Sequence, residues 1–314
     1  MLIPYIFVTI NLIIKNIVAM DKKKNSKRTT KWYVINIKSR GIQKPQTYID
    51  AFDKLKASDP LVKLRGNRYI SIKSMYKAEL LENDGYVRSI LVTLSAYDLI
   101  DPDGFYNRRS KENVSLFLDP DIAANASEVE IIFVPRVHRL AMRTNSKISL
   151  KNVHKYFLEA LDKAIGEDAF DVTIVKDRNF IEQILSSSAI YSIEAELSYS
   201  NRDPSDGFQS VFDKKIREMN PTRLSMNIRG TQDVPLEATK DGLIEAIANL
   251  SESNGYIKAK VRDGEEVKNI NTEDFPLNMR LDSNPAEDLY ISAYNELINR
   301  FDNNRPIDID NEQG

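Results

Sequence analysis

KWYVINIK, residues 31–38, is the stretch with which the folded part of this chain begins. Successive side chains of a β-strand point to opposite faces of a sheet, so this stretch has two distinct sides. The sides are Tyr33, Ile35 and Ile37 on one face, and Trp32, Val34, Asn36 and Lys38 on the other. The pattern predicts the first strand of the fold.

The residues that follow this strand predict a sheet with few helices. Tyr48, Phe52 and Leu55 have helical spacing and predict a helix over residues 46–57. Turns containing Asp, Pro and Gly separate the β-type stretches that come next. These stretches are residues 68–76, 85–95, 114–118 and 129–134. Residues 31–147 are therefore expected to form a β-rich N-terminal domain.

From residue 149 onward, helical stretches alternate with short strands rich in β-branched residues. The expected helices are 150–165, 179–186, 207–218, 236–250 and 285–301, and the expected strands are 170–176, 190–199, 224–229, 255–261 and 277–281. Such alternation indicates β-α-β units on a small mixed sheet, with ferredoxin-like character and helices on one face. We expect an α+β protein whose second domain spans residues 148–301. The polar, acidic residues 302–314 predict a disordered tail.

Composition limits the functions that this chain can have. Its 314 residues are 42% hydrophobic and 29% charged, which is ordinary for a globular protein and sufficient for two cores. The formal net charge is -2, so any attraction to nucleic acid must come from local patches. Because cysteine is absent, disulfides, thiolate nucleophiles and sulfur-ligated zinc are excluded, which fits a reducing cytoplasm.

Residues 1–30 form an apolar segment followed by a basic leader. Residues 2–20 are mostly apolar and are interrupted by Asn11, Lys15 and Asn16. The basic run follows the apolar stretch and no small-residue cleavage site ends it, so a secretory signal is not expected. Two alternatives stay open. Translation starts at Met20, or the segment is a membrane anchor whose trailing cations hold the carboxyl side in the cytoplasm.

Common catalytic motifs are missing from the sequence. His138 and His154 are the whole supply of histidine for a base or a metal ligand, and both are expected to be structural. The chain has no glycine-rich pattern for cradling phosphate. We therefore expect no cofactor and no small-molecule substrate.

Clustered carboxylates are the remaining route to catalysis. Asp98, Asp101 and Asp103 lie close in the sequence and could hold a metal ion in a magnesium-dependent nuclease. Pro102 and Gly104, the residue types that turns require, lie beside them. The second acidic cluster, at residues 203–207, also contains Pro and Gly. The Glu-x-Lys at residues 266–268 is expected to fall in a charged loop. A turn is therefore the favoured interpretation of both acidic clusters.

Two segments, residues 61–77 and 135–157, carry cations with no carboxylate between them. Such segments can bind a polyanion backbone by counterion release, without reading its sequence. The alternative is a pair of solvated faces balanced by acidic residues from elsewhere in the chain. The cations expected to contact nucleic acid are Lys63, Arg65, Arg68, Lys73, Arg136, Arg139, Arg143, Lys147 and Lys151.

Several stretches resemble a bacterial family catalogued as domain of unknown function 4747. The stretches that carry the resemblance are residues 33–37, 170–175, 181–185, 191–194, 254–260 and 272–277. Members of that family are associated with antiviral gene clusters, so the resemblance implies a defence role. The layout of residues 31–301 also resembles, more distantly, the RexA phage-exclusion proteins. That likeness implies a non-enzymatic homodimer that binds DNA without sequence preference, and it assigns no individual residue.

The leading hypothesis is therefore a bacterial anti-phage defence protein that binds DNA non-specifically, without catalysis, and forms a homodimer in the cytoplasm. A metal-dependent nuclease built on the clustered carboxylates is the rival enzyme hypothesis. A third hypothesis is a non-catalytic sensor or scaffold that recognises a phage protein or a membrane effector.

Overall fold

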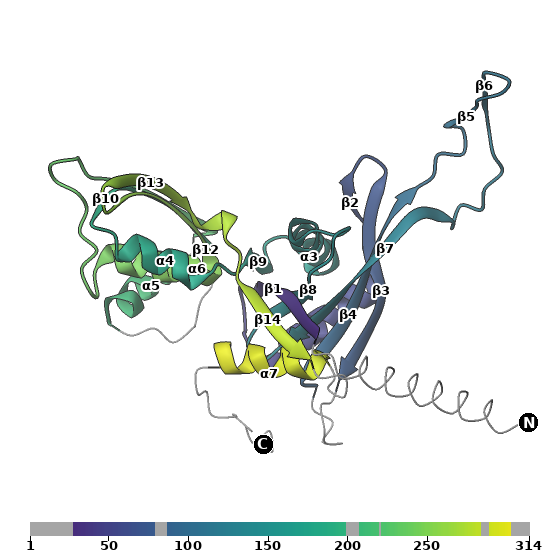
Figure 1. Ribbon diagram of the computed structural model, residues 1–314. Coiled ribbons are helices and arrows are strands. Elements are labelled where there is room, and N and C mark those ends of the chain that lie inside the picture. Colours follow the sequence, from purple (N-terminus) through teal and green to yellow (C-terminus); the bar gives the residue numbers. More distant parts are fainter. Residues whose placement is uncertain (1–27, 79–86, 199–206, 220, 284–288, 303–314) are drawn as a thin grey trace, which may run out of the picture.

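The computed structural model describes residues 28–78, 87–198, 207–219, 221–283 and 289–302 (Figure 1). Labels follow Figure 1. The elements of the first half are β1 (Arg28–Ser39), α2 (Pro45–Ser58), β2 (Val62–Arg65), β3 (Arg68–Ala78), β4 (Ser89–Leu99), β5 (Phe105–Asn107), β6 (Glu112–Val114), β7 (Ala123–Val134) and β8 (Arg139–Arg143). Those of the second half are α3 (Leu150–Ile165), β9 (Phe170–Ile174), α4 (Arg178–Leu185), β10 (Ala189–Ser198), α5 (Gly207–Met219), β11 (Arg223–Arg229), α6 (Leu243–Asn254), β12 (Gly255–Asp263), β13 (Glu266–Asn271), the 3-10 turn η1 (Thr272–Asp274), β14 (Asn278–Ser283) and α7 (Leu289–Phe301).

β1 pairs with three other strands of a large antiparallel sheet. Within the described residues this sheet has eight strands, in the order β14-β1-β8-β7-β4-β3-β2, and β9 also pairs with β1. β14 pairs with the first half of β1, while β9 pairs with residues 35–39 of β1. Strands from both ends of the chain therefore meet on the stretch predicted to begin the fold.

The two faces of β1 lie in two different hydrophobic cores. Ile35 and Ile37 are fully buried in the core that α2 and α3 cover. Trp32 and Val34 are fully buried on the opposite face, in the core that α7 covers. The alternation predicted from the sequence is confirmed. Each such side chain contributes about 1.5–3 kcal/mol on burial. β1 therefore stabilises the packing of α2 and α3 on one face of the sheet and of α7 on the other.

The second sheet contains β11, β10, β12 and β13 in that order, and every neighbouring pair is antiparallel. α4 and α6 pack on one of its faces, where Ile193, Ala195 and Ile257 are buried. Figure 1 shows α4, α5 and α6 together on that side. The α+β class and the helices on one face are confirmed. The sequence predicted a mixed sheet, which contains parallel strand pairs. Among the described residues, every strand pair of the second sheet is antiparallel.

Two of the hydrophobic cores contain residues from both sides of the domain boundary expected between residues 147 and 148. α3 packs on the large sheet through Val153 and Phe157, and β9 pairs with β1. β14 and α7 also return to the large sheet. The smaller core draws on residues 180–270. Helical periodicity reports that a face is buried, but it does not report which sheet buries it.

Several element predictions need correction. β2, β5, β8 and β13 were not expected, and residues 266–268 lie in β13 rather than in a loop. The strand expected at 114–118 ends at Val114, and the helix expected from residue 236 begins at Leu243, after Gly242. Within the described part of the chain, no helix is long and apolar enough to cross a membrane. The predictions for residues 1–27 and 303–314 lie outside the described residues.

Candidate nucleic-acid interface

The nine predicted cations have different surroundings: one is buried, four form ion pairs, and four are exposed. Arg139 is buried, where its guanidinium donates to the side-chain oxygen of Asn36 at 2.5 Å and to the backbone oxygen of Val137 at 3.2 Å. A guanidinium held inside the protein in this way does not reach a phosphate. Arg139 therefore serves the junction between the two sheets instead of an interface.

Four of the other predicted cations form ion pairs with carboxylates. The pairs are Arg68 with Asp98 at 3.1 Å, Lys73 with Glu128 at 2.5 Å, Arg136 with Asp302 at 2.7 Å and Arg143 with Glu130 at 2.7 Å. Each carboxylate comes from outside the acid-free segment of its partner, as the alternative of balanced faces expects. Charge neutralised in this way attracts a polyanion weakly.

Lys63, Arg65, Lys147 and Lys151 are exposed, and no ion pair of theirs is found in the described part of the chain. The Lys63 ammonium lies 6.0 Å from the centre of the Tyr69 ring. Lys147 lines a small hollow with Glu128 and Asn145. Lys63 and Arg65 lie on β2, Lys147 lies in the loop before α3, and Lys151 lies in the first turn of α3.

The acidic candidates around Asp98 and both histidines are occupied by structural contacts, while the acidic residues of the second cluster, at 203–206, lie outside the described residues. Asp98 accepts from Arg68 and from the Asn125 amide at 2.8 Å, and these hydrogen bonds lower its pKa. The Gly104 amide donates to the Asp101 carbonyl at 3.2 Å, which agrees with a turn. Among the described residues, no group of three or more His, Asp or Glu side chains is placed to hold a metal ion.

Both histidines lie within the fold. His154 contacts the backbone oxygen of Val172 at 2.9 Å, and burial lowers its pKa although that hydrogen bond opposes the shift. His138 is buried, and its ring stacks on Tyr48 with centres 4.5 Å apart. These surroundings are typical of structural histidines.

A different surface, the helix-free face of the second sheet, gathers polar and cationic side chains. It is called the open face below. Ile193, Ala195 and Leu197 of β10 are buried against the helices, so the residues between them point to the open face. The alternate residues of the four strands that share this face are Ser192, Glu194, Glu196, Ser198, Arg223, Ser225, Asn227, Arg229, Tyr256, Lys258, Lys260, Arg262, Val267, Asn269 and Asn271.

Cations outnumber carboxylates on the open face. Glu196 pairs with Arg223 at 2.8 Å, and Glu194 pairs with Lys258 at 3.6 Å. Partial burial opposes the charge on Lys258, but the neighbouring Tyr256 and Glu194 outweigh it and raise the pKa of Lys258. The carboxylates of this face are therefore already matched by cations.

Arg229, Lys260 and Arg262 are the excess cations of the open face. No ion pair to any of them is found among the residues that the structure describes. Arg229 donates to the side-chain oxygen of Asn227 at 3.1 Å, and the Arg262 guanidinium lies 5.5 Å from the centre of the Tyr191 ring. These contacts orient both guanidinium groups without neutralising them.

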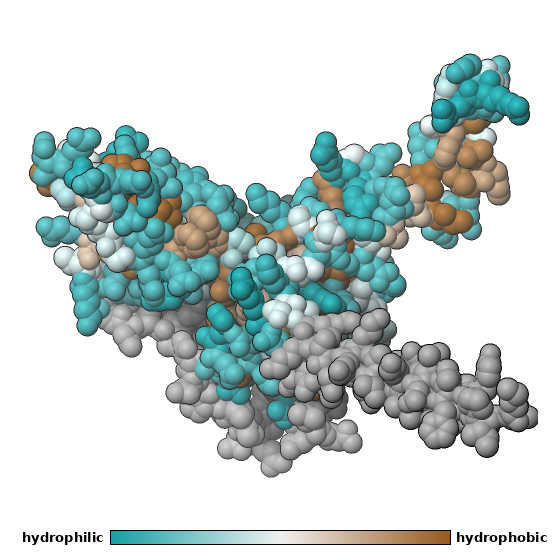
Figure 2. Space-filling model, viewed as in Figure 1, coloured by the Kyte–Doolittle hydropathy of each residue, from teal (hydrophilic) through white to brown (hydrophobic). Residues whose placement is uncertain are grey.

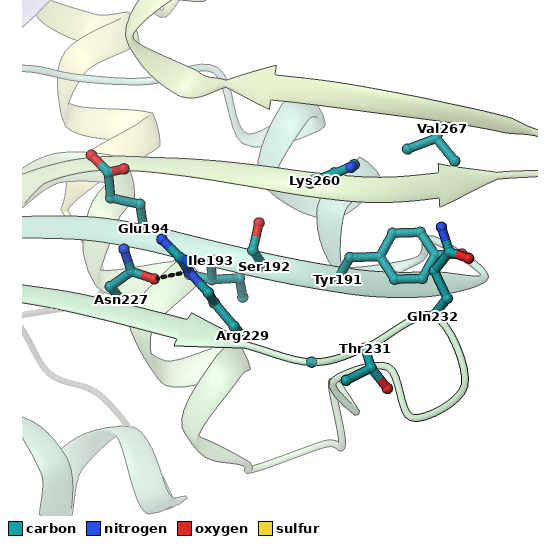
Figure 3. Close-up of a pocket in the computed structure, with 11 residues that line it drawn as sticks. Tyr191, Ser192, Ile193, Glu194, Asn227, Arg229, Thr231, Gln232, Lys260 and Val267 are labelled. Atoms are coloured by element: carbon teal, nitrogen blue, oxygen red, sulfur yellow. Dashed lines mark hydrogen bonds between the residues drawn. The ribbon is translucent and has the colours of Figure 1, made fainter.

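A hollow of about 510 Å³ lies on the open face, and its lining includes Arg229, Lys260 and Glu194, the ion-pair partner of Lys258 (Figure 3). Arg229 and Lys260 flank Ser192 on the two neighbouring strands, because both are register partners of Ser192. Asn227, Thr231 and Gln232 add amide and hydroxyl groups to the lining. Positive charge with neutral donors around it is the arrangement that a phosphate oxygen needs.

Backbone geometry builds one wall of this hollow. The Gly230 amide donates to the Tyr191 carbonyl at 2.8 Å, and the Thr231 amide donates to the Val234 carbonyl at 2.9 Å. A Cβ atom on Gly230 would lie only 2.8 Å from the Val234 carbonyl oxygen. Glycine therefore lets the loop after β11 fold back beside β10.

Sequence reasoning missed this site although a signal was present. Lys258, Lys260 and Arg262 recur at every second position of a segment that was predicted as a strand. Period-two spacing places them on one face. This short stretch, which Asp263 and Glu265 follow directly, was not among the acid-free segments selected. Arg229 joins them only through strand pairing.

These two antiparallel sheets, with helices on both faces of one and on one face of the other, define an α+β protein with an open, cationic sheet face. A family model described as Domain of unknown function (DUF4747) matches residues 28–299. The chain belongs to this family. No curated protein matches the chain.

Proposed function

We propose that this protein binds DNA non-specifically, through the sugar-phosphate backbone, on the open face of the second sheet, and does not cleave it. The observation that carries the proposal is the position of Arg229 and Lys260 in the lining of one hollow, with Arg262 on the same face of β12. None of the three forms an ion pair among the described residues, and Glu194, which also lines the hollow, is paired with Lys258. Phosphate contacts supply most of the affinity in sequence-independent binding.

The chemistry of the face favours contact with the backbone over recognition of bases. Tyr256 is the most accessible aromatic of the face, and its ring is already approached by the Lys258 ammonium at 4.7 Å from the ring centre. Tyr191 is buried. Because sequence-tolerant base binding relies on stacking against free aromatic faces, base stacking is a minor part of the proposed mode.

The size of the patch sets the expected strength. Each phosphate neutralised contributes about 0.9 to the slope of log affinity against log salt for duplex DNA, and about 0.7 for single strands. Three cations therefore predict a slope near -3 for the duplex and near -2 for a single strand. Binding of this kind is weak at physiological salt and strengthens steeply as salt is removed.

The test is a titration of fluorescently labelled duplex and single-stranded DNA with the protein, over a series of salt concentrations, with magnesium present and absent. The proposal predicts salt-sensitive binding, equal affinity for unrelated sequences, and DNA that stays uncleaved with and without magnesium. Sequence-independent RNA binding with no DNA binding would redirect the proposal to the other nucleic acid. Magnesium-dependent fragments would contradict the absence of cleavage, and no binding at low salt would contradict the proposal itself.

A role in anti-phage defence is part of the same proposal, supported by the family resemblance described above. Expression in a bacterial host is expected to lower phage plating. Replacing Arg229 and Lys260 with Glu is expected to restore plating if the open face acts in defence. If the Arg229→Glu, Lys260→Glu protein still lowers phage plating, its defence role does not depend on DNA binding by the open face.

A further inference from the structure

Residues 99–123, called the arm below, leave the end of β4 and return at the start of β7. The backbones of Leu99 and Ala123 pair at its base. Its internal hydrogen bonds include the Leu116 amide to the Pro102 carbonyl at 2.9 Å and the Ser115 hydroxyl to Asp103 at 2.6 Å. Figure 1 shows that the arm, with β5 and β6 near its tip, projects away from both sheets. It is therefore an ordered projection that the rest of the described chain leaves uncovered.

The middle of the arm exposes large apolar side chains. Phe117 is fully exposed, while Ile122, next to the base, is 55% exposed and Tyr106, in β5 near the tip, is 54% exposed. Leu116 is 43% exposed. Figure 2 shows hydrophobic residues gathered along the arm below a hydrophilic tip. An aromatic side chain buries about 150–250 Å² when covered, so this grouping favours an interface.

The two ends of the arm carry opposite charges. Arg108, Arg109 and Lys111 lie in and beside the turn between β5 and β6, at the tip, and with the exposed Glu112 they leave the tip a net charge of about +2. At the base lie Asp101, Asp103, Asp119 and Asp121, all exposed. No ion pair to any of these residues is found in the described part of the chain. The arm thus has a cationic tip, an apolar middle and an acidic base.

We propose that the arm is a self-association surface, on which the arms of two copies of this chain pair antiparallel about a two-fold axis. In this arrangement each cationic tip lies beside the acidic base of the partner arm, and the apolar middles face each other. A two-fold interface must be complementary to itself, and a surface with opposite charges at its two ends meets that condition. Another occupant would have to reproduce the same inverted charge pattern.

The area available is that of a stable interface. The exposed apolar side chains of one arm, together with the polar groups between them, offer roughly 600–1,000 Å². A standard interface buries about 800 Å² on each partner. Pairing of two arms therefore reaches the required size without a contribution from either sheet.

The first experiment measures the mass of the full-length protein in solution, without nucleic acid, by sedimentation at micromolar concentrations. The wild-type protein is expected to be a dimer, and Phe117→Asp is expected to raise the dissociation constant at least tenfold. Ile42→Asp is the matched control, because Ile42 is also well exposed, at 63%, but lies in the β1–α2 loop. A monomeric wild-type protein, or a Phe117→Asp protein as dimeric as the control, would overturn the inference.

The second experiment exchanges the charges. Arg108→Glu with Arg109→Glu puts an acidic tip against the acidic base, and Asp119→Arg with Asp121→Arg cancels the negative charge of the base, where Asp101 and Asp103 remain. Each double variant alone therefore loses the tip-to-base attraction and is expected to be monomeric. An equimolar mixture is expected to form a heterodimer, because the unchanged cationic tip of one variant then lies beside the unchanged acidic base of the other. A mixture that stays monomeric, or double variants that each remain dimeric, would contradict the antiparallel arrangement. Neither experiment depends on DNA binding, so the outcome is separate from that of the proposed function.

Discussion

The ammonium group of Lys38 lies 3.0 Å from the side-chain oxygen of Asn254, and both residues are buried. Lys38 belongs to β1 of the large sheet, and Asn254 is the last residue of α6 on the second sheet. A cation at the carboxyl end of a helix interacts favourably with the helix dipole. This contact joins the two sheets and positions the second sheet on the first.

Replacing Lys38 with Met is expected to destabilise the protein by about 1–3 kcal/mol, because the Asn254 side-chain oxygen loses a buried donor. Asn254→Leu in the same background is expected to recover part of this loss, since both partners are then apolar. Urea unfolding of the two single variants and the double variant measures the coupling. Additive effects of the two changes would show that the contact does not link the sheets.

Arg139→Met is expected to lower the free energy of unfolding by about 1.5–3 kcal/mol, because hydrogen bonds to a buried charged group are lost. The guanidinium also donates to the Ser253 hydroxyl at 3.2 Å, so the change again affects the junction with α6. Affinity for DNA is expected to stay within twofold of the wild-type value. Unchanged stability together with weaker DNA binding would place Arg139 at an interface after all.

Lys176 gives the stability of the protein a specific dependence on pH. Burial lowers the pKa of Lys176 from 10.5 to about 8, although Glu273 opposes the shift. As the pH falls from 10.5 to 8, the unfolded chain takes up a proton that the folded protein does not. Stability therefore falls over that window, and below pH 8 the loss stays constant.

Lys176→Met removes this loss, so the variant should gain stability relative to the wild-type protein as the pH is lowered from 10.5 to 8. The relative gain is about 3 kcal/mol at most, at 1.36 kcal/mol for each pKa unit. Urea unfolding at pH 7 and pH 10.5 measures it. A difference between variant and wild type that is equal at both pH values would contradict the assignment.

Gly255→Ala is expected to destabilise the second sheet by about 2–4 kcal/mol. A Cβ atom at Gly255 would lie 1.9 Å from the Glu196 carbonyl oxygen, which is backbone of the neighbouring strand. The strands would have to separate to admit it. Gly41→Ala is the control, because its nearest neighbour would be 3.7 Å away. Thermal unfolding compares the two, and equal melting temperatures would argue against the close approach of β10 and β12.

Local patterns predicted much of this fold. The helix expected at residues 150–165 has those same bounds, and the alternation of β1 correctly divided Ile35 and Ile37 from Trp32 and Val34. Strand pairing was not predictable in this way. β9 and β14 both pair with β1 across long separations in the sequence, and no local pattern specifies a partner.

The surroundings of the charged residues also depend on strand pairing, which local sequence patterns do not predict. Acid-free runs selected Arg68, Lys73 and Arg143, but strand pairing brings each beside a carboxylate from another strand. Conversely, Lys260 and Arg229 were passed over and become neighbours through β10. A cluster of charge depends on tertiary contacts that the order of residues does not state.

The most direct test of the proposed interface compares two double variants by fluorescence anisotropy with labelled duplex DNA over a salt series. Arg229→Gln with Lys260→Gln is expected to weaken binding at least tenfold at low salt and to reduce the salt slope by about 2, since each lost phosphate contact removes about 0.9. Lys63→Gln with Lys151→Gln removes the same charge from elsewhere and is expected to change the slope by less than 1. Unchanged binding by the first variant, with a loss in the second, would contradict the account and return the interface to the segments first selected from the sequence.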